Sequence, residues 1–345
     1  MKKIGLSIGF IALIFLLLLG YIFFIDDPQN LYNAINTAKF LPMLAGVIMM
    51  VLYWVFETLA QYIIIKKGDG KKLRFSSILR VTMIGQLFNC ITPSASGGQP
   101  MQTYQLTKYG LSAGEGACVL LVRFLVYQSV MVLYSLIVLI VKLPYFNRNI
   151  NAFSSLAIIG FLVNSGALAA LIAACFFPHF CAKAANAIIK FLGKIKILKN
   201  PDDKINKINA EIDKFHANFQ YYRMNFKVML WPAVFSALQL TCFFLVPVFI
   251  CKSLSVNISF GDAFGAAALT FMICSFVPLP GGSGGAEGGF LLLFGSAFAA
   301  SGKSIAVAIL LWRLLTFYMP IVVGSCFIFK NKHEVKNYMK TGGAE

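Results

Sequence analysis

The sequence predicts an all-α integral membrane protein, a polytopic helix bundle with two opposed re-entrant hairpins in an inverted repeat. Of its 345 residues, 59% are hydrophobic and only 12% are charged, which is far too apolar for a soluble domain of this length. Several uncharged stretches reach the roughly 20 residues that a helix needs to cross a bilayer. Two Gly/Pro-rich breaks, TPSASGGQP from Thr92 and PLPGGSGGAE from Pro278, interrupt otherwise apolar segments.

Six stretches are long and apolar enough to be predicted as spans. The first follows Lys2 and Lys3 as a signal peptide would, but its apolar run is too long and lacks a small-x-small cleavage site. We therefore interpret it as a retained span. Two further apolar segments, 75–116 and 258–302, each contain one break near the middle. The predicted spans are Ile4–Ile25, Phe40–Ile65, Ala117–Val141, Ala152–Phe177, Val228–Cys251 and Ile305–Phe329.

Basic residues predict how these segments sit in the bilayer, because short cytoplasmic loops carry an excess of Lys and Arg. Such residues follow the second span (66–74), recur through 183–227 and follow the last span (330–340). All three regions should be cytoplasmic, and so should both termini. For these regions to be cytoplasmic, the chain must be on the cytoplasmic side both before and after the first broken segment, which therefore enters and leaves on that side. By the same count of spans, the second broken segment enters and leaves on the outer side. The alternative is that either segment consists of two short full spans.

The order of span, broken segment and Arg-bearing span occurs twice. We therefore expect a single transmembrane domain over residues 1–345, with one repeat at 40–141 and a second, inverted repeat at 228–329. An inverted pair of interrupted segments indicates a transporter-like site near the bilayer midplane.

The linker between the repeats, 178–227, has its own pattern. Basic residues in 183–227 favour contact with an anionic lipid surface, either as a simple anchor or with a regulatory role. A helix start is predicted at 200–202. One face of an amphipathic helix is formed by residues at steps of three and four, namely Ile205, Ile208, Ile212, Phe215, Phe219 and Tyr222.

The two breaks are candidate binding loops, because non-helical backbone inside a bilayer must be satisfied by protein or by a water-filled cavity. In the first break, Gly97 and Gly98 permit positive φ and close approach, and Gln99 offers hydrogen bonds. In the second, Gly281 and Gly282 precede a half-helix whose free N–H groups would suit an anionic head group. The alternative is a tight structural corner that binds nothing.

Four charged residues lie within the predicted spans or at a break, namely Glu57, Arg123, Glu287 and Arg313, and Arg80, in the first arm of the first broken segment, is a candidate fifth. An unpaired charge there costs several kcal/mol, so each should face a partner or a cavity. One interpretation is a pair of internal ion pairs, Glu57 with Arg123 and Glu287 with Arg313, that lock the bundle. The other is that an Arg binds a phosphate while a Glu balances it. Both can hold in turn during a transport cycle.

The composition argues against several other classes of protein. The net charge of +17 lies mostly beside the ends of apolar segments, as topology requires, so we expect no nucleic-acid partner. Eight Cys residues contain no C-x-x-C pair, and the three His residues are scattered. We therefore expect no metal, no cofactor and no catalytic residue. The oligomeric state stays open, a homo-oligomer included.

At its two motifs the chain resembles the lysylphosphatidylglycerol synthase transmembrane region family, also called the flippase-like domain family. The resemblance covers nearly the whole chain. Many members follow the first Gly pair with an Arg, whereas Gln102 lies near that position here, as in a GGQP subgroup. The matching residues are TPSASGGQPMQTYQL (92–106), Arg123, PLPGGSGGAEGGF (278–290), Arg313, Pro320 and Gly324.

The resemblance implies a function in lipid movement. Its best-known members join a membrane part that moves lipid between leaflets to a soluble domain that transfers lysine from its tRNA to phosphatidylglycerol. Only about 16 residues follow Phe329, and the one sizeable cytoplasmic loop has about 50, which is too short for a transferase fold. We therefore expect a bacterial inner-membrane protein that flips a polar, anionic or aminoacylated phospholipid or glycolipid without synthesising it. The alternatives are a phosphatidylglycerol lysyltransferase and a non-transporting lipid-binding scaffold. The expected substrate-binding residues are Glu57, Gly97, Gly98, Gln99, Arg123, Gly281, Gly282, Glu287 and Arg313.

Overall fold

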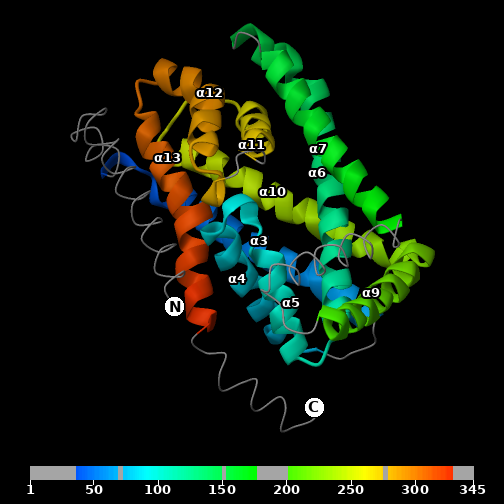
Figure 1. Cartoon of the computed structure of the whole chain (residues 1–345). Helices are drawn as coiled ribbons and strands as arrows, with labels where there is room; N and C mark the ends of the chain where they lie inside the picture. The colour runs from blue at the N-terminus through cyan, green and yellow to red at the C-terminus, as the bar shows by residue number, and fades with distance from the viewer. Residues whose placement is uncertain (1–35, 69–72, 150–152, 177–200, 275–278, 329–345) are drawn as a thin grey trace.

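The structure, a computed structural model, describes residues 36–68, 73–149, 153–176, 201–274 and 279–328 (Figure 1). Within these ranges every regular element is a helix and no strand is present. In chain order the elements are α3 (Phe40–Gly68), α4 (Phe75–Ile91), the 3₁₀ turn η1 (Pro93–Ala95), α5 (Gly98–Lys108), α6 (Ala113–Asn149), α7 (Phe153–Phe176), α9 (Pro201–Met224), the 3₁₀ turn η2 (Phe226–Met229), α10 (Leu230–Ser253), α11 (Phe260–Cys274), the 3₁₀ turn η3 (Pro280–Gly282), α12 (Gly285–Ala300), α13 (Ile305–Arg313) and the π-helical turn η4 (Leu314–Tyr318).

Four of the described helices are long and apolar enough to cross a membrane, and they confirm four of the predicted spans. The predicted span at Ala152–Phe177 corresponds to α7, a helix of 24 residues. The predicted span at Ile4–Ile25 lies outside the described residues. The chain is therefore an all-α, multi-pass membrane protein. Its four candidate spans are Phe40–Gly68, Ala113–Lys142, Phe226–Ser253 and Ile305–Ile328.

The most extensive helix contact in the described part of the chain is between α3 and α10. Phe56 on α3 stacks on Phe235 of α10 there, with ring centroids 6.1 Å apart. The larger apolar core lies beside α10, where Phe244, Phe290 and Trp312 are buried in one cluster. Because lipid tails are as apolar as these side chains, close packing and hydrogen bonds must hold such a bundle together.

Each predicted broken segment consists of two helices that pack against each other across a short turn. The first broken segment is α4, η1 and α5, and the second is α11, η3 and α12. α4 ends at Ile91 because Thr92 precedes a proline, which favours extended backbone, and Thr92 has φ −115° and ψ 146°. The turns η1 and η3 contact each other, so two distant parts of the sequence meet at one place.

Small residues allow α4 to pack closely with its neighbours. A Cβ atom on Gly85 would overlap the Gln102 side chain of α5, and a Cβ atom on Gly98 would overlap Asn89. The close approach predicted for Gly98 is thereby confirmed. On the last span, a Cβ atom on Gly324 would lie 2.7 Å from the carbonyl oxygen of Met83 in α4.

The amphipathic helix predicted between the repeats is α9, which begins at Pro201 as expected. Its side chains Phe215, Phe219 and Tyr222 pack against a buried cluster that includes Ile64 and Ile65 of α3. Tyr222 Oη donates a hydrogen bond to the carbonyl oxygen of Ile64 (3.0 Å), and Tyr221 Oη donates one to that of Lys67 (2.7 Å). These bonds attach α9 to the end of α3, where the carbonyl of Lys67 is one of the last four and lacks a partner within the helix.

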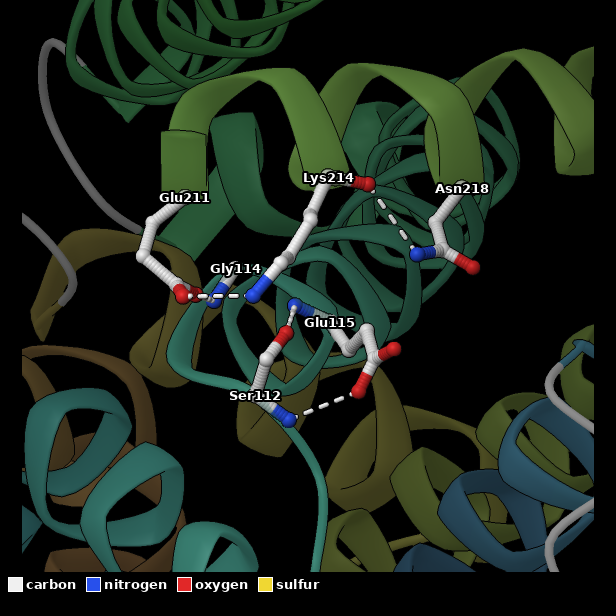
Figure 2. A network of polar contacts seen from close by, with 6 residues as sticks. All are labelled: Ser112, Gly114, Glu115, Glu211, Lys214 and Asn218. Carbon is white, nitrogen blue, oxygen red and sulfur yellow. Dashed lines mark hydrogen bonds and ion pairs between the residues drawn. The ribbon is translucent and has the colours of Figure 1, made fainter. Parts of the chain in front are cut away.

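An earlier turn of α9 binds the start of α6 (Figure 2). Glu211 Oε2 accepts a hydrogen bond from the backbone N–H of Gly114 (2.6 Å), and a Cβ atom on Gly114 would overlap the carbonyl oxygen of Glu211. Ser112 and Glu115 form a capping box around the same helix start. Thus α9 is fastened to both helices that flank the first broken segment.

We expect the attachment of α9 to weaken in acid. The hydrogen bond from Gly114 N–H and the Lys214 ammonium, 2.9 Å away, hold the pKa of the Glu211 carboxyl below its usual value. A lowered folded-state pKa stabilises the attachment above the pKa of an unfolded glutamate, and this contribution is lost as the pH falls through the folded pKa. Hydrogen-exchange protection of residues 209–224 should therefore fall over that acidic range. The fall should be smaller in Glu211→Gln, and an identical pH dependence in both proteins would contradict the assignment.

Candidate functional site

Arg313 lies where the two broken segments meet. The residue is on α13 and is 4% exposed. Its Nε donates to Glu287 Oε1 (2.7 Å), and its Nη1 donates to the carbonyl oxygen of Gly281 (2.9 Å). Cys90, at the end of α4, packs with Phe317, one turn after Arg313. One guanidinium therefore binds the turn and the second helix of the second broken segment, near the end of α4.

Glu287 organises the second turn as well as pairing with Arg313. Its Oε2 accepts a hydrogen bond from the backbone N–H of Gly284 (2.7 Å), the residue that precedes α12. One carboxylate thus caps the helix with one oxygen and binds Arg313 with the other. Ser283 Oγ closes the turn by donating to the carbonyl oxygen of Pro280 (2.8 Å). Of the sequence alternatives, the internal pair of Glu287 with Arg313 is present.

The Arg313 guanidinium has a hydrogen-bond donor left over. Its Nη2 is buried and has no hydrogen-bond partner among the described residues. A buried donor without a partner costs about 1–3 kcal/mol, and more when it is charged, so water or a ligand normally satisfies it. The rings of Trp312 and Phe317 lie 5.3 and 5.5 Å from the guanidinium carbon and favour the cation. The remaining donor suits a phosphate or carboxylate oxygen.

The π-helical turn η4 follows Arg313 directly, and single π turns in helices are frequent at functional sites. Phe317, within η4, lies against Gly281, whose φ is +61°. A Cβ atom on Gly281 would overlap the Phe317 ring. Both the backbone conformation and the space therefore require glycine at this position.

Gly281→Ala should lower the free energy of unfolding by about 2–5 kcal/mol. A non-glycine residue in left-handed conformation costs about 1–2 kcal/mol, and overpacking against Phe317 about 1–3 kcal/mol more. Gly302 has the same positive φ (+61°) but open space around it, so Gly302→Ala isolates the backbone cost. Gly288 has neither constraint, and Gly288→Ala should cause no loss. Unfolding of the purified variants in mixed SDS micelles measures this series, and equal losses at Gly281 and Gly302 would contradict a role for Phe317.

A hydroxyl group holds the turn of the first broken segment. Thr92 Oγ1 donates to the carbonyl oxygen of Phe88 (2.6 Å) and accepts a hydrogen bond from the backbone N–H of Gly97 (2.8 Å). This side chain therefore links the last turn of α4 to the start of α5. Gln99 is exposed at the second position of α5.

The left-handed residues of this turn are Ser94 and Ala95, with φ of 51° and 52°. The positive φ predicted for Gly97 and Gly98 is wrong, because Thr92 holds Gly97 at φ −84° and the tight turn comes before it. In the second turn Gly281 and Gly282 both have positive φ. Left-handed non-glycine residues cost about 1–3 kcal/mol each and cluster at ligand clamps and switch regions.

Glu57 forms a second polar centre inside the bundle. Its side chain is 1% exposed, and its Oε1 pairs with Arg123 Nη2 of α6 at 3.0 Å. Its Oε2 accepts hydrogen bonds from the Nε2 atoms of Gln86 on α4 and Gln239 on α10. One carboxylate thus joins α3, α4, α6 and α10. The internal pair of Glu57 with Arg123 is therefore present too.

The polar centre around Glu57 is separate from the turns η1 and η3. Gln86 precedes Thr92 by six residues, which is about 9 Å along α4. Sequence reasoning missed Gln86 and Gln239, because amides carry no charge. Their presence inside apolar helices is the signal that could have found them. Among the described residues, no group of three or more His, Cys, Asp or Glu side chains could hold a metal ion.

Apolar spans, two broken segments in contact and buried ion pairs define a polytopic membrane protein with a charged centre inside its bundle. The chain belongs to the lysylphosphatidylglycerol synthase TM region family, whose model matches residues 5–324, and this confirms the resemblance found in the sequence. It is also similar to a UPF0104 membrane protein from Archaeoglobus fulgidus. The two are 24% identical over 323 residues, which cover 88% of this chain and 90% of the relative.

Proposed function

We propose that this protein moves a lipid across the bilayer by passing its polar head group through the junction of the two broken segments, without synthesising the lipid. The observation that carries the proposal is the guanidinium of Arg313. It is a buried cation at the contact of two membrane segments, and its Nη2 has no partner among the described residues. A phosphate oxygen matches this donor in charge and geometry, and every phospholipid head group contains one.

The membrane arrangement that we propose follows from the distribution of Lys and Arg among the loops, which predicts the side of the membrane on which each segment begins and ends. The first broken segment would be a hairpin from the cytoplasmic side and the second a hairpin from the outer side, in repeats at 40–141 and 228–329. Because η1 and η3 contact each other, Arg313 would then lie near the bilayer midplane. The exposed residues Ser94, Ser96 and Gln99 would offer further hydrogen bonds to a head group there.

Glu287 would alternate with the substrate as the partner of Arg313. Between transport events the carboxylate neutralises the guanidinium. An arriving phosphate would replace this contact, because both groups are oxyanions that accept hydrogen bonds from Arg. An aminoacylated head group would also bring an ammonium that the released carboxylate could bind. The Glu57–Arg123 pair would stay in place as a fixed brace, since its carboxylate already has three donors.

Reconstitution into vesicles tests this proposal. Fluorescent phosphatidylglycerol, lysylphosphatidylglycerol and phosphatidylethanolamine would be placed in both leaflets, and dithionite would be added outside. For the transported lipid, the chain should raise the reduced fraction of label above that of protein-free vesicles. Bound lipid without flux would instead indicate a scaffold. Formation of lysylphosphatidylglycerol after addition of lysyl-tRNA would indicate a synthase.

A further inference from the structure

One end of the bundle combines exposed lysines from two helices. Lys66 and Lys67 are exposed in the last turn of α3, and Lys227 is exposed in η2, just before α10. The hydrogen bond from Tyr221 Oη to the carbonyl oxygen of Lys67 brings the end of α9 to the end of α3. We call Lys66, Lys67 and Lys227 the basic rim.

Large apolar side chains are exposed close to the basic rim. Met224 is 75% exposed, Phe226 64% and Trp231 57%. Trp231 packs on Phe235 with ring centroids 6.2 Å apart, so its ring lies along the surface of α10. These residues adjoin or begin the apolar span Phe226–Ser253. Exposed Trp and Lys at the end of a span is the composition of a membrane–water interface, so the bilayer itself is the occupant that this surface fits.

We propose that the basic rim binds anionic phospholipid head groups of the adjacent leaflet, at a site separate from Arg313. None of the three lysines forms an ion pair with a described residue. Their alkyl stems can lie along the exposed apolar side chains while the ammonium groups reach lipid phosphates. The sequence assigned lipid-surface contact to 183–227. The structure adds the two lysines of α3 to that surface, through the attachment of α9.

Tryptophan quenching by brominated lipids tests the proposal on the full chain. Trp54 and Trp312 are 5% and 4% exposed, so Trp231 is the tryptophan that bilayer lipid reaches most readily. The Trp231 signal is obtained as the difference between the wild-type chain and Trp231→Phe. In phosphatidylcholine vesicles, a small share of brominated phosphatidylglycerol should quench this signal more than the same share of brominated phosphatidylcholine. Attraction to an anionic surface enriches lipid by about fivefold per lysine at most, and salt should reduce it.

In the triple variant Lys66→Gln/Lys67→Gln/Lys227→Gln, the two brominated lipids should quench the Trp231 signal equally. A matched control is Lys252→Gln/Lys303→Gln, which removes exposed lysines at the far end of α10 and before α13, and should keep the preference. No preference in the wild-type chain, or a preference that survives in the triple variant, would overturn the proposal. Because Arg313 is unchanged in all these variants, this outcome is independent of the transport assay.

Discussion

Glu57→Ala should lower the free energy of unfolding by about 3–5 kcal/mol, the range for breaking a buried ion pair by removing one partner. The carboxylate is 1% exposed and accepts hydrogen bonds or an ion pair from Arg123, Gln86 and Gln239. Its removal would leave a guanidinium and two amides buried without their acceptor. Helix content followed by circular dichroism during SDS titration would measure the loss.

Two further variants separate this effect from general damage. Glu57→Ala combined with Arg123→Met should recover part of the loss, because the uncompensated buried charge is gone. Asp262→Ala removes a partly exposed ion pair with Lys142 (2.8 Å) and a hydrogen bond from Ser259 Oγ, and should cost about 1–2 kcal/mol. Similar losses for Glu57→Ala and Asp262→Ala would show that the joining of four helices at Glu57 contributes little.

Arg313→Lys should slow transport about 10- to 100-fold in the dithionite assay. Lysine keeps the charge, but its ammonium cannot reproduce the planar fork of Arg313. In the proposed cycle, Nη1 keeps the Gly281 carbonyl oxygen, Nε exchanges Glu287 Oε1 for the phosphate, and Nη2 is offered to the phosphate as well. Losing one hydrogen bond to a charged group costs about 1.5–3 kcal/mol, and 1.4 kcal/mol corresponds to a factor of ten.

A structural role for Arg313 predicts a different result. Arg123→Lys is the matched control, because Arg123 pairs with Glu57 away from the turns and should leave the choice of head group unchanged. Arg313→Lys should reduce the preference for the favoured head group as well as the rate. If only stability falls, while the transport rate per folded molecule and the head-group preference stay the same, then Arg313 stabilises the bundle and does not bind the head group.

The helices and the breaks were predictable because a bilayer imposes a strong pattern on sequence. Long apolar runs, each with at most one charged residue, located the spans that α3, α6, α10 and the last helix confirm. Pro and Gly located the turns η1 and η3. The two ion pairs were among the sequence alternatives because a charge within a span needs a partner. Their role in lipid binding stays a prediction.

The details of the site depend on neighbours that only folding brings together. Gln86 and Gln239 reach Glu57 from helices distant in sequence. Thr92 holds the first turn through a hydroxyl group, and the left-handed conformation moves from the glycines to Ser94 and Ala95. The sequence does not show that the two amides meet Glu57. No composition rule would have selected Thr92, Ser94 or Ala95, because each type is common in other roles.

Because α9 is attached at two points, the number of residues between these points is constrained. Glu211, bound to the start of α6, and Tyr222, bound to the end of α3, are eleven positions apart. Eleven residues are about three helical turns and about 16 Å, so both side chains leave α9 on the same face. One inserted residue would rotate one attachment by about 100° relative to the other. In related proteins this stretch should therefore vary in sequence more freely than in length.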